Sequence, residues 1–416
     1  MILDAISKDL QELFNNKLVK SNIVFPIKDE KTGARIEWQS SKPEILSASG
    51  EFKRDYIAHE IILTANLYHN GSNKTVEFKV ISEGYKSLTK SIASSYIYTN
   101  YEIADQEYFE TMEIIFAAFA LADKKGNLLQ HPSTINCLEN ISKYLKAGAS
   151  KHGCWLILSI GGGGQSDEFV DIAATQESRV LFSKNVVELL NQYQLDGIDI
   201  DWETPTLEQA PTFTLLMEEL YKQIKANNPH HLLTTPITGG RWQPPCYDLF
   251  NAIKYIDYVN MMTYGMTNNQ RQYHNALYPS TKNRTLETCS IDESVKIFND
   301  LGVPNHKLIA GLAYYGMSQL KDENEKWVGD KSFSYTQIKE NLDQGTFIEY
   351  YDVECEQPYA LDSNNQIFVS YDSPRSIIAK CQYVERKGLA GVMYWQHGQD
   401  KTGELTRAIR KSFKFK

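Results

Sequence analysis

Eight short apolar runs alternate with longer amphipathic segments over most of this chain. The runs are SSYIYTNY (94–101), EIIFAAFA (113–120), WLILSIG (155–161), LDGIDIDWE (195–203), LLTTP (232–236), YVNMMTY (258–264), LIAGLAYY (308–315) and AGVMYW (390–395). Each run fits a buried strand, and segments such as ESRVLFSKNVVELLNQY between them fit helices. Strands that alternate with helices build parallel sheets. Eight such units over roughly 320 residues predict a (β/α)8 TIM barrel, with an open doubly wound sheet as the alternative.

Two further features of this region refine the prediction. The segment SPRSIIAKCQYVERKG is typical of a complete helix, with Ser373 as N-cap, Pro374 at the first helical position and Gly388 past the end. The chain from about 317 to 372 is too long for one connection between a strand and a helix. We therefore expect a small α+β insertion there.

The first part of the chain has a different pattern. Residues 1 to about 85 contain RIEW, IILTANLY and VEFKV, in which apolar residues alternate with polar ones, as in strands with one buried face. The last two runs are joined by HNGSN, and its Asn70-Gly71 pair is a strong hairpin signal. We expect a small all-β sandwich over residues 1–88, followed by the barrel over residues 92–416.

Composition excludes several classes of function. The net charge of −9 argues against nucleic acid or an anionic membrane as the main partner. The six cysteines show no CxxC and no zinc-ligand spacing. No run reaches the length of a membrane span. The opening MILDAISKDLQ does not read as a signal peptide.

The fourth strand candidate ends in a dense acidic run, LDGIDIDWETP. Successive side chains of a strand point to opposite faces, so Asp199, Asp201 and Glu203 share one face. Like charges along one face destabilise an ordinary solvated strand. A calcium loop would need a glycine that this run lacks. In a barrel, the carboxyl end of a strand is where the chemistry is carried out, so these acids are the candidate active site. In a regular strand the side chain of Asp196 would point to the opposite face, so we expect it to give structural support.

The glycine run GGGG at 161–164 has a less chemical interpretation. Neither the GK[ST] of a phosphate-binding loop nor a GxGxxG dinucleotide context is present, so a tight turn after the strand fits better. His152, His274 and His397 are assigned no chemistry.

The motif DGIDIDWE resembles the DxxDxDxE signature of family 18 glycoside hydrolases, the chitinases and their relatives. Further stretches resemble the family in order over residues 92 to 412: LILSIGG, MMTY, HNALYP, LIAGLAYYGM and YDSPRSIIAKCQYVERKGLAGVMYW. Near the start of the chain, IEWQSSKPEILSASGEF resembles the bacterial Ig-like modules appended to secreted glycosidases.

The resemblance implies a role for each site residue. Glu203 would be the general acid, Asp201 would hold the acetamido N–H of the substrate, and Asp199 would share a proton with Asp201. Tyr264 would hold the acetamido carbonyl, and Trp395 would form the floor of the sugar site. Further substrate-binding positions would be Met262, Gly162, Phe119 and Asn275, with Ser159 joining Asp196 as structural support. No metal or organic cofactor is implied.

The implied function is endo-acting, retaining hydrolysis of β-1,4-linked N-acetylglucosamine polymers, in which the 2-acetamido group of the substrate acts as the nucleophile. The alternatives are an endo-β-N-acetylglucosaminidase acting on N-glycans or peptidoglycan, and an inactive sugar-binding protein. The expected partner is thus a polysaccharide or glycan rather than nucleic acid. The resemblance also implies a secreted protein, exported by another route or preceded by further sequence, and we expect a monomer.

Two positions depart from the family pattern. The Asp of the family's MxYD motif is replaced by Gly265, and the Arg that often follows the seventh strand is replaced by Met317. Both changes remove charge from the rim of the expected cleft, so binding of the leaving group is expected to be weaker.

Overall fold

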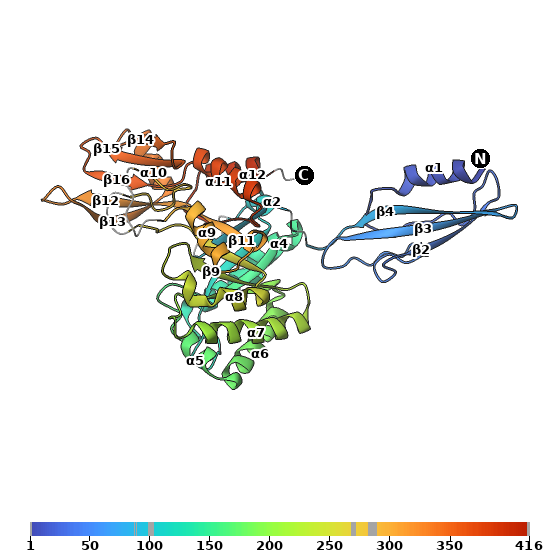
Figure 1. Ribbon diagram of the computed structural model, residues 1–416, viewed down its shortest axis with the longest axis horizontal. Helices are drawn as coiled ribbons and strands as arrows, with labels where there is room; N and C mark the ends of the chain where they lie inside the picture. Colours follow the sequence, from blue (N-terminus) through green and yellow to red (C-terminus); the bar gives the residue numbers. More distant parts are fainter. Residues whose placement is uncertain are drawn as a thin grey trace. The chain divides into compact units, whose positions relative to one another are not determined.

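The computed structural model describes residues 2–86, 88, 90–98, 104–267, 272–281 and 289–413. The chain divides into two compact units, Met1–Ser87 and Leu88–Lys416 (Figure 1). Each unit has its own hydrophobic core.

The first unit contains one four-stranded sheet in the order β1-β4-β3-β2. Its strands are β1 (Lys17–Val19), β2 (Arg35–Ser40), β3 (His59–His69) and β4 (Ser72–Ser82). Strands β3 and β4 form the predicted hairpin, and both residues of its turn have positive φ, 44° at Asn70 and 78° at Gly71. This left-handed geometry is the reason for the Asn-Gly pair.

Residues 2–14 correct the prediction that this unit is β throughout. They form helix α1 (Ile2–Phe14), which packs on the sheet. Ile6, Leu10 and Phe14 are buried at a spacing of four residues, which suits a helix and not a strand. The ring of Phe14 lies 5.2 Å from that of Trp38, between centroids. Within the described residues, α1 thus covers the sheet where a sandwich would have a second sheet.

The second unit is built on the predicted barrel. Eight strands close in the order β10-β11-β17-β5-β6-β7-β8-β9, and every neighbouring pair is parallel. They are β5 (Ile92–Ile97), β6 (Ile114–Ala120), β7 (Trp155–Gly161), β8 (Gly197–Asp201), β9 (Leu232–Thr238), β10 (Tyr258–Met262), β11 (Leu308–Ala313) and β17 (Gly391–Trp395). Closure of the sheet rules out the open doubly wound alternative. The end of the first predicted run, residues 99–101, lies outside the described residues.

Helices surround this barrel (Figure 1). They are α2 (Gln106–Thr111), α3 (Pro132–Asn140), the π-helix η2 (Ile141–Leu145), α4 (Lys146–His152), α5 (Phe169–Ala174), α6 (Gln176–Tyr193), α7 (Ala210–Asn227), η3 (Pro244–Tyr247), α8 (Leu249–Ala252), η4 (Ile253–Tyr255), α9 (Ile291–Asp300), η5 (Asn305–Lys307), α11 (Pro374–Lys387) and α12 (Glu404–Ser412). As predicted, α11 follows Ser373 as N-cap and ends at Gly388, whose φ is 68°. No helix among the residues described is long and apolar enough to cross a membrane.

The predicted α+β insertion begins directly after β11. It contains β12 (Tyr315–Lys321), β13 (Trp327–Ser334), α10 (Tyr335–Asp343), β14 (Phe347–Asp352), β15 (Gln357–Asp362) and β16 (Ile367–Ser370). The strands pair in the order β13-β12-β16-β15-β14, and the neighbours are antiparallel. This sheet is drawn in orange in Figure 1.

Candidate active site

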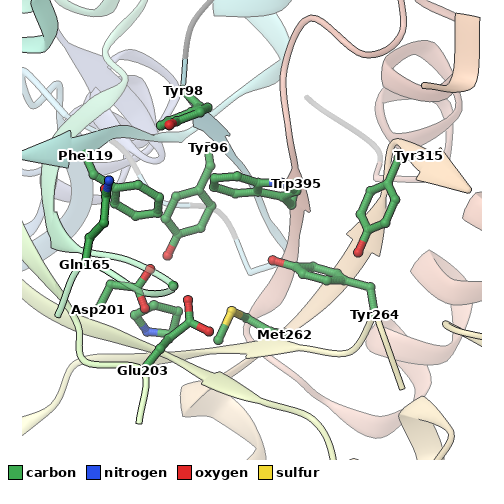
Figure 2. A pocket seen from close by; sticks show the side chains of 12 residues that line it. Tyr96, Tyr98, Phe119, Gln165, Asp201, Glu203, Met262, Tyr264, Tyr315 and Trp395 are labelled. Atoms are coloured by element: carbon green, nitrogen blue, oxygen red, sulfur yellow. The ribbon is translucent and has the colours of Figure 1, made fainter. Parts of the chain in front are cut away.

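A cavity of about 380 Å³ opens at the carboxyl ends of the barrel strands. Asp201, Met262 and Trp395, each the last residue of its strand, all lie in its wall. The complete lining is Tyr96, Tyr98, Phe119, Gly163, Gln165, Asp201, Glu203, Pro236, Met262, Tyr264, Tyr315 and Trp395. Figure 2 shows Asp201 and Glu203 side by side at one edge, with aromatic rings on the opposite side.

Strand β8 brings the acids to this cavity by its alternation. Ile198, Ile200 and Trp202 belong to the hydrophobic core, and the ring of Trp202 lies 5.8 Å from that of Phe169, between centroids. The intervening Asp199 therefore points to the inside of the barrel, as the pattern predicts.

Asp199 is fully buried beneath the cavity floor. Its Oδ2 accepts hydrogen bonds from Tyr96 Oη at 2.9 Å and Ser159 Oγ at 2.7 Å. Its Oδ1 accepts one from Thr234 Oγ1 at 2.6 Å. Burial raises the pKa of Asp199 to about 6, although these hydrogen bonds oppose the shift. Asn260 completes the network by donating to Tyr96 Oη at 3.0 Å.

Asp201 has less support than its neighbour. It is 2% exposed, and its Oδ1 has no hydrogen-bond partner among the described residues. Burial, the charge of Glu203 and the charge of Asp199 raise the pKa of Asp201 well above its usual value. A buried carboxyl oxygen without a donor is costly, so this atom is poised to accept a hydrogen bond from a ligand.

Glu203 follows β8 and is half-buried. Burial raises the pKa of Glu203, while interactions with Asp201 and the backbone of Gly163 act in the opposite direction. All three carboxyls thus shift toward their protonated forms. This is the condition that a general acid needs near neutral pH.

Aromatic side chains form the other walls. Trp395 stacks on Phe119 with centroids 5.7 Å apart and planes at 20°, and Tyr98 lies 5.9 Å from Trp395. On the other side, Tyr264 and Tyr315 meet edge to face at 6.0 Å. In the view of Figure 2 the first group lies above the carboxyls, and Tyr264 and Tyr315 lie to their right. Such walls suit the apolar faces of sugar rings.

Most of the predicted site residues come together here. Glu203, Asp201, Tyr264, Trp395, Met262 and Phe119 line the cavity. Asp199 and Ser159 lie beneath it. A Cβ built on Gly162 would lie 2.9 Å from the ring of Phe119, so this glycine supports the wall rather than lining the cavity.

Asp196 lies away from the cavity, at the start of β8. Its Oδ2 accepts a hydrogen bond from the backbone of Leu156 at 2.7 Å and so joins β8 to β7. A supporting role stays the prediction for Asp196.

Asn275 is not part of the cavity, contrary to the prediction. The residue is fully buried. Its Nδ2 donates to Asp372 at 2.6 Å, and its Oδ1 accepts from Gln357 at 3.0 Å. Both polar ends are thus occupied within the protein, where they join the segment before α9 to the insertion.

The sequence reasoning missed several residues of the wall: Tyr96, Tyr98, Gly163, Gln165, Pro236 and Tyr315. Tyr96 and Tyr98 alternate in the first strand candidate and so share a face, which was a usable signal. Tyr315 directly follows the seventh strand, at the end where barrel sites form. Gln165 gave no signal.

The two departures from the family pattern have different surroundings. Gly265 is exposed, its φ is 68°, and its backbone N–H donates to His274 Nδ1 at 3.2 Å. Burial lowers the pKa of His274 to about 3, so its ring is neutral. Met317 lies half-buried in β12.

Within the described part of the chain, no group of three or more His, Cys, Asp or Glu side chains is arranged to hold a metal ion.

Comparison with known proteins agrees with this geometry. Residues 94–400 match the family described as Glycosyl hydrolases family 18, and residues 4–82 match the Atrophied bacterial Ig domain. Chitinase A1 of Niallia circulans is 25% identical over 65% of this chain, which spans 44% of that protein's length. A class V chitinase of Medicago truncatula is 27% identical over 82% of this chain and 93% of its own length.

Among solved structures, the family 18 N-acetylglucosaminidase of Paenibacillus barengoltzii is similar, with a TM-score of 0.70 and 26% identity. The alignment covers 77% of this chain and 99% of that one. With the family match over most of the chain, this likeness accounts for both the barrel and the acidic strand. The chain belongs to glycosyl hydrolase family 18 and carries an atrophied bacterial Ig domain in its first unit.

Proposed function

We propose that this protein hydrolyses β-1,4-linked N-acetylglucosamine polymers, such as chitin and chito-oligosaccharides. The proposed catalysis is retaining and substrate-assisted, and it cleaves internal bonds of the polymer. The observation that carries the proposal is the Asp201 carboxyl. Its buried Oδ1 lacks a partner among the described residues, and the carboxyl lies beside Glu203 in an aromatic-walled cavity. An acetamido N–H of the substrate supplies the missing donor. The chitinases among the relatives support the same substrate class.

In the first step, Glu203 donates its proton to the glycosidic oxygen as the bond to the anomeric carbon breaks. The acetamido carbonyl oxygen of the same sugar attacks that carbon, which gives an oxazolinium ion and the free alcohol of the leaving chain. Asp201 accepts a hydrogen bond from the acetamido N–H, and its negative charge stabilises the oxazolinium cation. The proton shared with Asp199 moves away from Asp201 as the positive charge develops.

In the second step, the ionised Glu203 accepts a proton from water as the water oxygen attacks the anomeric carbon. This attack opens the oxazolinium ring and gives a product with the original anomeric configuration. Trp395 is the floor under the reacting sugar, and Tyr264 holds the acetamido oxygen in line. The cavity thus fixes the acetamido group from both of its ends.

Inhibition by a thiazoline tests the mechanism. A stable thiazoline analogue of the oxazolinium ion is expected to inhibit competitively, since it carries the same ring against Asp201. The matched control compares the N-acetylglucosamine tetramer with the fully deacetylated tetramer. Hydrolysis of the acetylated substrate alone supports the proposal, whereas comparable cleavage of a polymer without acetamido groups contradicts it.

A second candidate substrate is the N-acetylglucosamine core of an N-glycan or of peptidoglycan. It is favoured by the rim beside Tyr264, where Gly265 is exposed. Apart from its chain neighbours, no described residue has an atom within 4 Å of the position of a Cβ there. We propose that branches or peptides of the substrate are accepted at this rim. Oligosaccharides, glycoproteins and cell wall should be tested in parallel, with the products identified by mass spectrometry, which also distinguishes endo from exo cleavage.

An inactive sugar-binding role is disfavoured because the acid Glu203 is present and its pKa is raised. Since a polymer of this kind does not enter cells intact, we place the proposed activity outside the cell. We propose the monomer as the acting species.

A further inference from the structure

The loop that follows β7 is shaped by its glycines. Gly161, Gly162 and Gly164 have φ values of 110°, 103° and 70°, which residues with a side chain rarely adopt. The backbone N–H of Gln165 donates to the carbonyl of Gly162 at 2.9 Å and closes the turn. The run GGGG is therefore the tight turn that the sequence predicts, and it brings residues 163–166 against Glu203.

Ser166 uses its hydroxyl to hold the backbone of Glu203 on both sides. The N–H of Glu203 donates to Ser166 Oγ at 2.9 Å, and Ser166 Oγ donates to the carbonyl oxygen of Glu203 at 3.2 Å. Ser166 is 1% exposed, so water does not compete for these bonds. One hydroxyl thus satisfies both backbone groups of the residue that carries the acid.

The neighbouring backbone is fixed by other groups. The carbonyl of Asp201 accepts from the N–H of Gly162 at 2.9 Å, and that of Trp202 accepts from Tyr247 Oη at 2.7 Å. Among the described residues, Ser166 provides the side-chain hydrogen bonds to the backbone of Glu203. The strand hydrogen bonds of β8 end at Asp201, so beyond that point such contacts determine where the carboxyl lies.

We propose that Ser166 is a positioning residue that sets the reach of the Glu203 carboxyl toward the glycosidic oxygen. The inference rests on the proposed function, because it assumes that Glu203 is the proton donor. A misplacement of about 1 Å at a reacting group can lower the rate by roughly a hundredfold. Ser166 therefore acts on kcat through the placement of the acid, and it contributes little to binding.

The dependence of the rate on the leaving group tests this role. The Ser166→Ala and Ser166→Thr variants would be assayed on two substrates, the N-acetylglucosamine tetramer and the dinitrophenyl glycoside of diacetylchitobiose. The tetramer needs a proton on its departing oxygen, whereas dinitrophenolate leaves without one. Ser133→Ala is the matched control, since Ser133 Oγ donates to the carbonyl of Phe119 at 3.4 Å, in the same wall but away from the acid.

For Ser166→Ala, kcat on the tetramer is expected to fall by roughly ten- to a hundredfold. KM on the tetramer and kcat/KM on the dinitrophenyl glycoside should change by less than about threefold. Binding does not need the acid, and kcat/KM reports the first step alone, in which dinitrophenolate leaves without a proton. Ser166→Thr keeps the hydroxyl and should retain most of the activity on the tetramer. An equal loss on both substrates would show a structural role alone, and no loss on the tetramer would overturn the inference.

Amide hydrogen exchange at Glu203 provides a readout that does not require turnover. Exchange of this N–H should become at least about tenfold faster in Ser166→Ala than in the unmodified protein or Ser133→Ala, because its acceptor is lost. Unchanged exchange would contradict the contact itself. If the unmodified protein cleaves neither substrate, the proposed function is wrong, and the exchange rate still decides whether Ser166 holds Glu203. Should Ser166→Ala not fold, Ser166→Cys, which has nearly the same shape and weaker hydrogen bonding, takes its place.

Discussion

Two buried carboxyls in the same barrel unit, Asp372 and Asp201, have opposite surroundings. Asp372 follows β16 in the chain and forms an ion pair with Lys380, which is also buried. Both of its oxygens accept hydrogen bonds. Oδ1 accepts from Ser376 Oγ at 2.6 Å and from Lys380 Nζ. Oδ2 accepts from Asn275 Nδ2 at 2.6 Å and from the backbone N–H of Ala313 at 3.1 Å. Asp201 has carboxyls as its charged neighbours, and its Oδ1 has no donor within the described residues.

This difference separates Asp372, whose hydrogen bonds are made inside the protein, from Asp201, which has an oxygen without a donor among the described residues. Asp372 joins the insertion, β11, α11 and the segment before α9, and its charge is neutralised inside the protein. Among the described residues, Asp201 has a carboxyl oxygen without a donor, and we propose that the substrate supplies that donor. Burial alone does not separate the two residues, whereas the count of donors around each carboxyl does.

The largest expected effect is the loss of the cation at the structural site. Lys380→Met should lower the free energy of unfolding by about 3–5 kcal/mol, because it leaves Asp372 buried without a counter-charge. Chemical denaturation measures this change. Lys296→Met is the control, since it removes an exposed pair with Asp300 and should cost at most about 1 kcal/mol. A loss below 1 kcal/mol for Lys380→Met would contradict the comparison.

The pH dependence of stability reports the functional site. Burial raises the pKa of Asp199 from 3.8 to about 6, so the folded state binds this proton more tightly than the unfolded chain. The stabilising contribution of this proton to the free energy of unfolding is complete below about pH 4. It is lost as the pH rises through 6, which lowers the free energy of unfolding by about 3 kcal/mol.

Denaturation at pH 4 and pH 8 isolates this effect when the protein is compared with Asp199→Asn, which does not titrate. The unmodified protein should lose about 3 kcal/mol more than the variant between these pH values. Equal pH dependence in the two proteins would show that Asp199 is not the buried titrating group.

A smaller effect is expected at the rim. Gly265→Asp should raise kcat/KM on chito-oligosaccharides by about two- to twelvefold, if one new hydrogen bond reaches the leaving sugar, and should lower it on a bulky glycan. The φ of 68° strains any side chain there, so Gly265→Asn, with the same strain and no charge, is the control. Identical rates for the two variants on both substrates would mean that a carboxylate at this position does not affect specificity.

The smallest effect is expected for removal of the first unit. A chain that begins at Ser91 keeps the barrel unit and its cavity, so kcat/KM on soluble oligosaccharides should remain within about twofold. Activity on solid chitin is the companion measurement, since the module is free to act there as a spacer or docking unit. A folded truncated chain that is inactive on soluble substrate would show that the module completes the site.

The barrel and most of the site could be predicted because both depend on local patterns. The alternation in LDGIDIDWE placed Asp199 inside the barrel and Ile198 outside it, and the hairpin at Asn70-Gly71 followed from its backbone requirement. Helix α1 was missed although Ile6, Leu10 and Phe14 show helical spacing, because the neighbouring strands dominated the interpretation.

Other features depend on contacts that no local pattern encodes. Asn275 was predicted to bind substrate, yet its partners Gln357 and Asp372 lie 82 and 97 residues away in sequence. They are neighbours of Asn275 only because of the insertion. Ser166 is another example, since its two bonds to the backbone of Glu203 span 37 residues.

The central claim is that Glu203 donates the proton and is not a structural acid, and turnover of Glu203→Gln tests it most directly. Turnover of the N-acetylglucosamine tetramer by this variant should fall by about 10²–10⁴-fold. Binding of the oligosaccharide and the free energy of unfolding at neutral pH should be preserved, because an amide of the same shape replaces a half-buried carboxyl whose pKa is raised. A well-folded Glu203→Gln protein that retains more than about a tenth of the original rate would contradict the account.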